Sequence, residues 1–218
     1  MTYEEICRDP AVNVYIAQAD ASLKALGFTE HSFPHVTKVA CTAEKILTAL
    51  DYPERTVELA KIAGYLHDIG NVVNRVDHSQ SGAVMAFRIL DRMNFPPEEI
   101  AAIVTAIGNH DEGTGTPVNA LSAALILADK SDVRRSRVRD KADIAEDIHD
   151  RVNYSVTDSD LTVDVEKRTA TLSLTVDTEV SSVMEYFEIF MKRMLLCRKA
   201  AQMLGLTFQL TINGLQLV

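Results

Sequence analysis

The stretch YLHDIGN, residues 65–71, closes a predicted helix that spans about residues 54–67. The apolar side chains of this helix recur with the 3.6-residue period of an amphipathic helix, and they include Val57, Ile62 and Leu66. The pair His67-Asp68 therefore stands where a helix ends, a place where polar side chains from several helices of a bundle can meet.

The helical pattern extends outward from this stretch over residues 1–153. Cap residues mark its first boundaries, because Asp9-Pro10 has the N-cap and first-turn proline of a helix start and Gly27 the position of a helix end. The predicted helices run from Pro10 to Gly27 and from Pro34 to about Leu50, then over about 54–67, 79–93, 97–109, 120–129 and 141–153.

The pattern changes to alternation near Ser155. Residues 157–180 predict a β-hairpin that turns near 166–168, and a long helix over about 181–204 follows. The segment 206–218 alternates again, with Asn213-Gly214 as its turn signal. We therefore predict a mainly α fold: a helical bundle over residues 1–154, followed by a small α+β appendage of β-β-α-β order over residues 155–218. We expect the appendage to be a packing element, a dimerisation element or a regulatory element. Dimerisation would give a homodimer.

Composition excludes several classes of protein. Hydrophobic residues make up 47% of the 218 residues and charged residues 24%, which argues against intrinsic disorder and collagen-like structure. No apolar stretch approaches the roughly 20 residues needed to span a bilayer. The net charge of −9 disfavours general binding to nucleic acid or anionic membranes. Three widely spaced cysteines and an N-terminus without a secretory pattern lead us to expect reduced thiols and a cytoplasmic protein.

Four of the six histidines lie at or near predicted helix ends. A lone histidine is more often a satisfied surface or core residue, and His31 and His149 are expected to be of that kind. Two His-Asp pairs at helix ends, together with a carboxylate that ends the apolar run ALILAD, are harder to explain in that way. The candidate metal ligands are His35, His67, Asp68, His78, His110 and Asp129. Nitrogen and carboxylate ligands suit Fe, Mn, Zn, Co or Ni, and a set without cysteine argues against structural zinc.

The order of these residues resembles the H…HD…H…H…D pattern of the HD-domain metal-dependent phosphohydrolases. The local context is similar too: HVTKVACTAEKI resembles the first helix of that family, YLHDIGN its His-Asp segment, HSQSG the start of its next helix and LILADKSDV its closing segment. The resemblance covers roughly residues 30–137.

The resemblance implies two divalent transition metals, with Fe or Mn expected first. His35, His67, Asp68 and Asp129 would hold one metal, and His78 and His110 the second, with Asp68 bridging. The implied reaction is hydrolysis of a phosphoester or phosphoanhydride by metal-bound hydroxide, with Asp68 and His67 as the central catalytic residues. The implied substrate is a phosphorylated small molecule, and the resemblance favours a nucleotide. Two alternatives stay open: a di-iron oxygenase with the same ligand type, and a metal-bearing nucleotide sensor without turnover.

The segment NHDEGTGTP, residues 109–117, resembles a shortened form of the HHExxDGTGYP stretch of the HD-GYP group. Asp111 stands where that stretch has a second histidine, which argues against a third metal of the HD-GYP kind. We predict that Asp111 lies beside the site and orients an imidazole without binding metal. The alternative for Gly113 and Gly115 is a plain turn before Pro117.

A basic segment begins beside Asp129. Residues 130–141 hold six basic side chains against two acidic ones in a protein of net negative charge. This pattern predicts a rim that binds phosphate, and the alternative is a solvated helix face. Helical geometry ranks Lys130 first as a substrate contact and Arg137 second, with Arg135 third if the helix breaks after Asp132.

Overall fold

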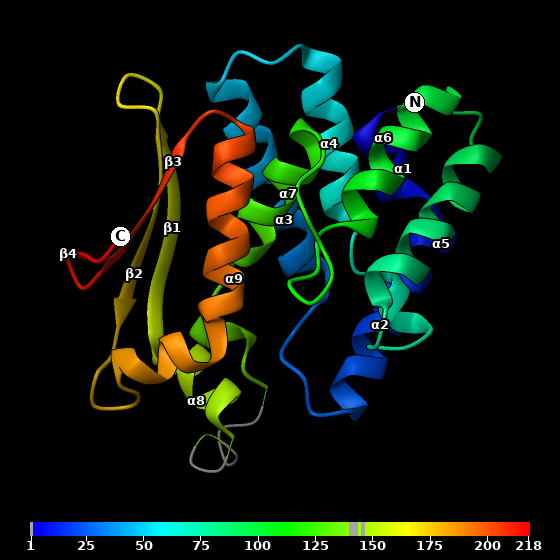
Figure 1. The fold of residues 1–218 in the computed structure, drawn as a ribbon. Helices are drawn as coiled ribbons and strands as arrows, with labels where there is room; N and C mark the ends of the chain where they lie inside the picture. Colours follow the sequence, from blue (N-terminus) through cyan, green and yellow to red (C-terminus); the bar gives the residue numbers. More distant parts are fainter. Residues whose placement is uncertain (1, 140–143, 145–146) are drawn as a thin grey trace.

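The computed structural model describes residues 2–139, 144 and 147–218. The helical part occupies one side of the molecule and the sheet the other (Figure 1). The helices are α1 (Tyr3–Arg8), α2 (Pro10–Ala25), α3 (Phe33–Ala49), α4 (Glu54–Leu66), α5 (His78–Arg92), α6 (Pro97–Gly108), α7 (Ala120–Lys130), α8 (Ile148–Ser155) and α9 (Val183–Met203), with 3₁₀ turns η1 (Ile69–Val72) and η2 (Arg135–Arg137). The predicted helix over 141–153 begins in a segment, 140–143 and 145–146, that lies outside the described residues, and α8 covers its second half.

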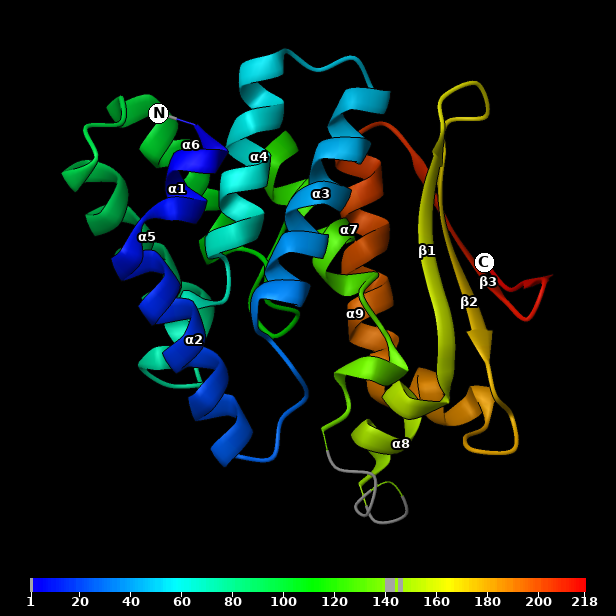
Figure 2. The same cartoon turned by 180° about the vertical axis from the view of Figure 1, so that it is seen from behind.

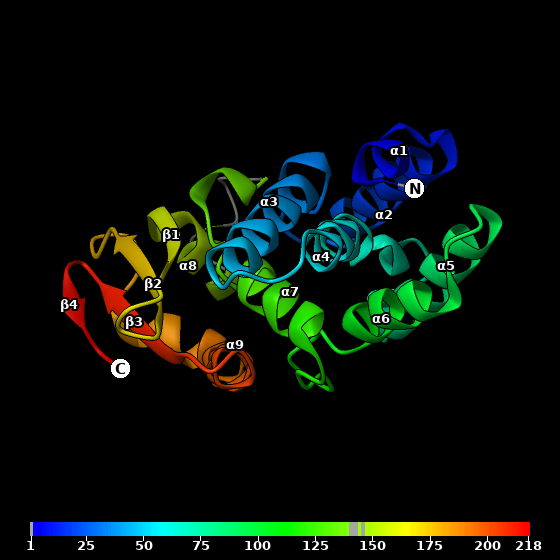
Figure 3. The same cartoon turned by 90° about the horizontal axis from the view of Figure 1, so that it is seen from above.

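Helix α7 forms the centre of the bundle. Every residue from Leu121 to Ala128 is buried, which fits a stretch that is apolar on all sides rather than on one face. Helices α3, α4 and α6 pack around it, and α1, α2 and α5 form the outer edge (Figures 2 and 3). An Asn119–Ser122 capping box fixes where α7 begins, so its last turn delivers Asp129 to the same end of the bundle as the close of α4.

The four strands form one sheet in the order β1-β2-β3-β4. Strands β1 (Val156–Asp164) and β2 (Thr169–Val176) are antiparallel, whereas β2 and β3 (Thr207–Ile212) are parallel because α9 crosses between them. Asn213 and Gly214 have φ values of +52° and +80°, which suits a tight turn into the short β4 (Leu215–Gln216). The β-β-α-β order is as predicted, and β4 extends it by one short strand.

Helix α9 lies between the sheet and the bundle (Figure 1). Its buried Cys197 and Ala200 belong to the same apolar cluster as the buried residues of α3 and α7. The boundary predicted near residue 154 thus falls inside a continuous core, and the mainly α class with a small C-terminal sheet is correct. Among the described residues, no helix has the length and hydropathy needed to cross a membrane.

Candidate metal centre

The six predicted ligands converge from five helices. His35 lies in the first turn of α3, His67 and Asp68 follow α4, His78 opens α5, His110 follows α6 and Asp129 lies near the end of α7. Five of the six are buried, and the Asp129 side chain is only 12% exposed. Residues up to 94 positions apart in the sequence therefore share one polar interior site.

Asp68 lies between two groups of imidazoles. Its Oδ2 is 3.6 Å from His35 Nε2 and 3.2 Å from His67 Nε2. Its Oδ1 faces the other way, 3.6 Å from His78 Nε2 and 4.0 Å from His110 Nε2. Asp129 Oδ1 joins the first group, 3.4 Å from His35 Nε2 and 3.7 Å from His67 Nε2. One oxygen of Asp68 thus faces each group of imidazoles.

The Nδ1 atom of each imidazole is occupied by an acceptor. His67 donates to the Gly64 carbonyl at 2.7 Å, His110 to the Ile107 carbonyl at 2.6 Å and His78 to the Arg75 carbonyl at 3.1 Å. His35 donates to Asp132 Oδ2 at 2.7 Å. Because these acceptors bind the Nδ1–H, each ring directs its Nε2 atom into the site, as metal-binding histidines do.

Asp132 is a site residue that sequence reasoning did not single out. Its side chain is fully buried, and it contacts Lys38 at 3.1 Å and Arg134 at 2.6 Å as well as His35. The segment LILADKSDV contains it three residues after Asp129, so the signal was present in the sequence. Burial raises the pKa of Asp132, but the bond from His35 and the charge of Arg137 lower it well below its ordinary value. Asp132 therefore stays ionised and holds the His35 ring.

The turn after α4 is packed tightly against the start of α5. A Cβ at Gly70 would lie 1.9 Å from the His78 carbonyl oxygen and 2.4 Å from the Gly82 nitrogen, so only glycine fits there. Asp77 precedes His78 with a left-handed φ of +56° and turns the chain into α5. This close approach places His78 opposite Asp68, and it explains the glycine of YLHDIGN.

Burial and mutual charge set the protonation of the site in the absence of metal. Burial raises the pKa values of Asp68 and Asp129, but His67 beside Asp68 and Lys130 beside Asp129 lower them well below their usual range. Burial lowers the pKa of His110 well below normal, and the charge of His67 adds to that shift. The carboxylates are therefore ionised and the His110 ring is neutral, which is the form that binds metal.

Two of the three predicted substrate contacts face this site. Lys130 and Arg137 line a small cavity of about 50 Å³ beside the imidazoles. The Lys130 ammonium lies 2.7 Å from Asp129 Oδ2 and 2.6 Å from Glu112 Oε2, and these carboxylates raise its pKa against the effect of burial. Arg137 donates to the Glu30 and Asp132 carbonyls.

Arg135 lies elsewhere. Helix α7 ends at Lys130, and the Arg135 guanidinium donates to the Tyr154 carbonyl and to Asp177 Oδ2 rather than toward the imidazoles. A break of the helix after Asp132 could turn this side chain inward, but in the structure it points to Tyr154 and Asp177 instead. The predicted contact from Arg135 to the substrate therefore has no support in this geometry.

Two further arginines at the small cavity escaped sequence reasoning. Arg75, from the turn before α5, places its Nη1 3.4 Å from His78 Nε2. Arg193, from α9, reaches the cavity from the appendage, and its buried Nε has no hydrogen-bond partner among the described residues. Neither residue lies in a motif, and the contact of Arg193 depends on how α9 packs. His31 also lines the cavity, although it was expected to be an ordinary histidine.

Asp111 caps its own loop. Its Oδ2 accepts from the Gly113 N–H at 3.0 Å, and among the described residues its carboxylate makes no hydrogen bond to an imidazole. The role of orienting a ring is filled at His35 by Asp132, so for Asp111 it stays a prediction. A Cβ at Gly115 would lie 2.3 Å from the Asn109 carbonyl oxygen, which makes this a compact turn that requires glycine.

The helical bundle and its His/Asp site define the class of protein. The chain belongs to the HD domain family, whose model matches residues 33–149, more than half of the sequence. It is also similar to an uncharacterized protein, MJ1020, of Methanocaldococcus jannaschii, with 28% identity over 162 residues. That match covers 64% of this chain and 62% of the relative.

Among solved structures, the chain is similar to a predicted HD superfamily hydrolase from an uncultured Thermotogales bacterium. The identity is 26%, the match covers 60% of this chain and 73% of the other, and the TM-score is 0.46.

The residues present fit divalent metal ions. The Nε2 atoms of His35 and His67 are buried and have no hydrogen-bond partner among the described residues, a costly arrangement that a bound cation would relieve. Two overlapping groups can each hold an ion: His35, His67 and Asp129 in one, and His67, Asp68 and His110 in the other. The centre is thus a metal site of imidazole and carboxylate ligands.

Proposed function

We infer that this protein is a phosphohydrolase that depends on two divalent metals. The observation that carries this proposal is the position of Asp68, whose two carboxylate oxygens face separate groups of imidazoles. Fe and Mn are the metals we propose first, since both accept mixed imidazole and carboxylate ligands.

The two metals would lower the pKa of a water and stabilise the attacking and leaving oxygens of an in-line displacement at phosphorus. His35, His67 and Asp129 would hold one ion and His78 and His110 the other, with Asp68 shared. The Nδ1 bonds to carbonyls and to Asp132 keep the rings in place. Because these Nδ1 hydrogen bonds already fix the imidazole rings, the rings would need little reorganisation when substrate binds.

The cations around the small cavity supply the complementary charge for a phosphate group. Lys130, Arg137, Arg75 and Arg193 all line it. Lys130 and Arg193 also pair with Glu112, at 2.6 and 3.4 Å, and metal would neutralise the carboxylates of Asp68 and Asp129. Arginine suits phosphate because its planar fork donates two parallel hydrogen bonds.

A larger cavity of about 330 Å³ adjoins the small one and shares Thr29, His31, Arg75, Asn153 and Arg193 with it. Phe28 and Phe190 line this larger cavity, and the guanidinium groups of Arg75 and Arg193 lie 5.5 and 4.0 Å from their respective ring centres. Aromatic rings beside cations suit a substrate that joins a flat ring to phosphate. We therefore favour a nucleotide.

The experiment is a phosphate-release screen over nucleotides with the metal-reconstituted protein, with oxygen uptake recorded in the same reactions. Release of phosphate that a chelator abolishes and added Mn or Fe restores is the expected result. Oxygen uptake without phosphate release would replace the proposal with the di-iron oxygenase. Tight nucleotide binding with neither activity would replace it with the sensor.

A further inference from the structure

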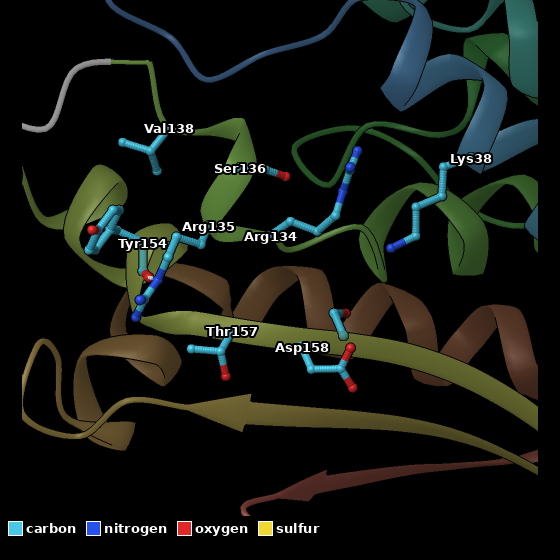
Figure 4. Close-up of a pocket in the computed structure, with 9 residues that line it drawn as sticks. Lys38, Arg134, Arg135, Ser136, Val138, Tyr154, Thr157 and Asp158 are labelled. Atoms are coloured by element: carbon cyan, nitrogen blue, oxygen red, sulfur yellow. Dashed lines mark hydrogen bonds between the residues drawn. The ribbon is translucent and has the colours of Figure 1, made fainter.

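A further cavity, of about 510 Å³, lies between η2, the end of α8 and strand β1. Figure 4 shows Lys38 entering it from α3, Arg134 and Ser136 from the η2 segment, and Tyr154 with Arg135 at the opposite end. None of the six predicted metal ligands lines it. Its volume is in the range of cavities that bind small molecules.

The cavity wall carries positive charge. Asp132, behind the wall, faces three cations: Lys38 at 3.1 Å, Arg134 at 2.6 Å and Arg137 at 3.7 Å. One carboxylate neutralises one of the three charges. Lys38 and Arg134 are the two that reach the cavity, with side chains 35% and 27% exposed.

Two carboxylates offset part of this charge at the rim. Asp177 pairs with Arg135 at 3.2 Å, and the exposed Asp158 lines the cavity from β1. Among the residues that line the cavity itself, the three cations Lys38, Arg134 and Arg135 stand against one carboxylate, that of Asp158. The imbalance favours an anion over a neutral or cationic ligand.

Asp132 does not use all the hydrogen-bond donors of the Arg134 guanidinium. Arg134 binds Asp132 through Nε at 2.6 Å and Nη2 at 3.1 Å, which uses two of the five N–H donors of a guanidinium. At the far end, the Arg135 guanidinium lies 4.4 Å from the centre of the Tyr154 ring and forms a flat surface with it. The cavity thus combines phosphate donors at one end with a stacking surface at the other.

We propose that this cavity binds a small phosphorylated molecule with a flat ring, and that its occupancy is transmitted to the metal centre through Asp132. The path consists of two contacts, from Lys38 and Arg134 to Asp132 and from Asp132 to the His35 Nδ1–H. A ligand phosphate draws the two cations toward itself. Asp132 then carries more of its negative charge on His35, which makes the His35 ring a better metal ligand. The ligand therefore tightens metal binding, and metal tightens ligand binding by the same factor.

The probe is phenylphosphonate, which has a ring and a phosphonate but no ester to hydrolyse. Its binding is measured by calorimetry with the full-length, metal-loaded protein, and metal loss to a chelator is followed with and without it. The test variant is Lys38→Gln with Arg134→Gln, and Lys38→Gln alone is the milder version. Arg88→Gln is the matched control, because Arg88 is an 81% exposed arginine on α5.

The proposal predicts that the double variant binds the probe at least about tenfold more weakly, since two charged hydrogen bonds are lost, while Arg88→Gln binds normally. The probe should slow metal loss from the wild-type chain and leave the rate unchanged in the double variant. No binding by the wild type, or equal binding by the double variant, overturns the site. Metal loss that the probe does not alter, or alters equally in the double variant, overturns the coupling. The binding result does not depend on whether the protein hydrolyses phosphate.

Discussion

At the scale of single residues, Asp68 contributes most to the account, because its two oxygens face different pairs of imidazoles. Replacement by alanine removes a ligand from both metals at once. We predict that Asp68→Ala loses most bound metal and all detectable phosphate release, measured by metal analysis and a phosphate assay on the same preparation. A variant that keeps both metals would show that Asp68 does not bridge.

The structure assigns the role of orienting an imidazole to Asp132, whereas the sequence predicts that role for Asp111. Asp132 accepts the His35 Nδ1–H, whereas Asp111 accepts a backbone N–H of its own loop. We predict that Asp132→Asn weakens metal binding by about 10–100-fold, the usual effect of removing a carboxylate that holds a ligating ring. Asp111→Asn, the matched control, should have the smaller effect in a chelator competition. The reverse order would restore to Asp111 the orienting role that its sequence position suggests.

The protonation of His67 makes metal binding depend on pH. In the metal-free site, burial lowers the pKa of His67, but Asp68 and Asp129 outweigh it and raise the value to about 10. Metal must displace this proton, so below that pH the affinity should rise with pH. The carboxylates contribute no proton near neutrality, because their pKa values lie well below the usual range. We predict about a tenfold rise in affinity per pH unit between about pH 6.5 and 7.5. Equal affinities at the two pH values would contradict this reading.

At the scale of elements, α9 links the appendage to the metal centre. It packs against α7 and places Arg193 at the cavity beside Lys130. We predict that Arg193→Gln lowers kcat/KM by about tenfold or more, as expected for a lost charged contact to phosphate. Lys192→Gln, an exposed neighbour on the same helix, is the control. The measurement is steady-state kinetics on preparations of known metal content. Equal kcat/KM values for the two variants would show that Arg193 does not bind substrate.

The helices and strands followed from local signals, and the contacts between them did not. The apolar period, the Asp9-Pro10 start and the Asn213-Gly214 turn are local properties, so the element order was predictable. The convergence of His35, His67 and His110 could be predicted because the order of these residues resembles the ligand pattern of the HD-domain family. The inward position of Arg193 and the outward one of Arg135 depend on how α9 and η2 pack, which no local pattern encodes.

At the scale of the whole molecule, the bundle and the sheet share one apolar core, with one cavity at the buried metal ligands and another lined by η2 and β1. Substrate is proposed to enter from the side where α9 supplies Arg193. The second cavity lies where β1 and η2 meet, on the side of Asp132. The C-terminal elements therefore contribute residues to the lining of both cavities.

The central claim is that hydrolysis requires two metals held by these six side chains. The most direct test is phosphate release from the best nucleotide of the screen, measured as Mn or Fe is returned stepwise to the chelated protein. The account predicts that activity is absent without metal and rises to a plateau at about two ions per chain, as expected for a two-metal site. Activity that is full without metal, or no phosphate release at two bound ions per chain, would contradict it.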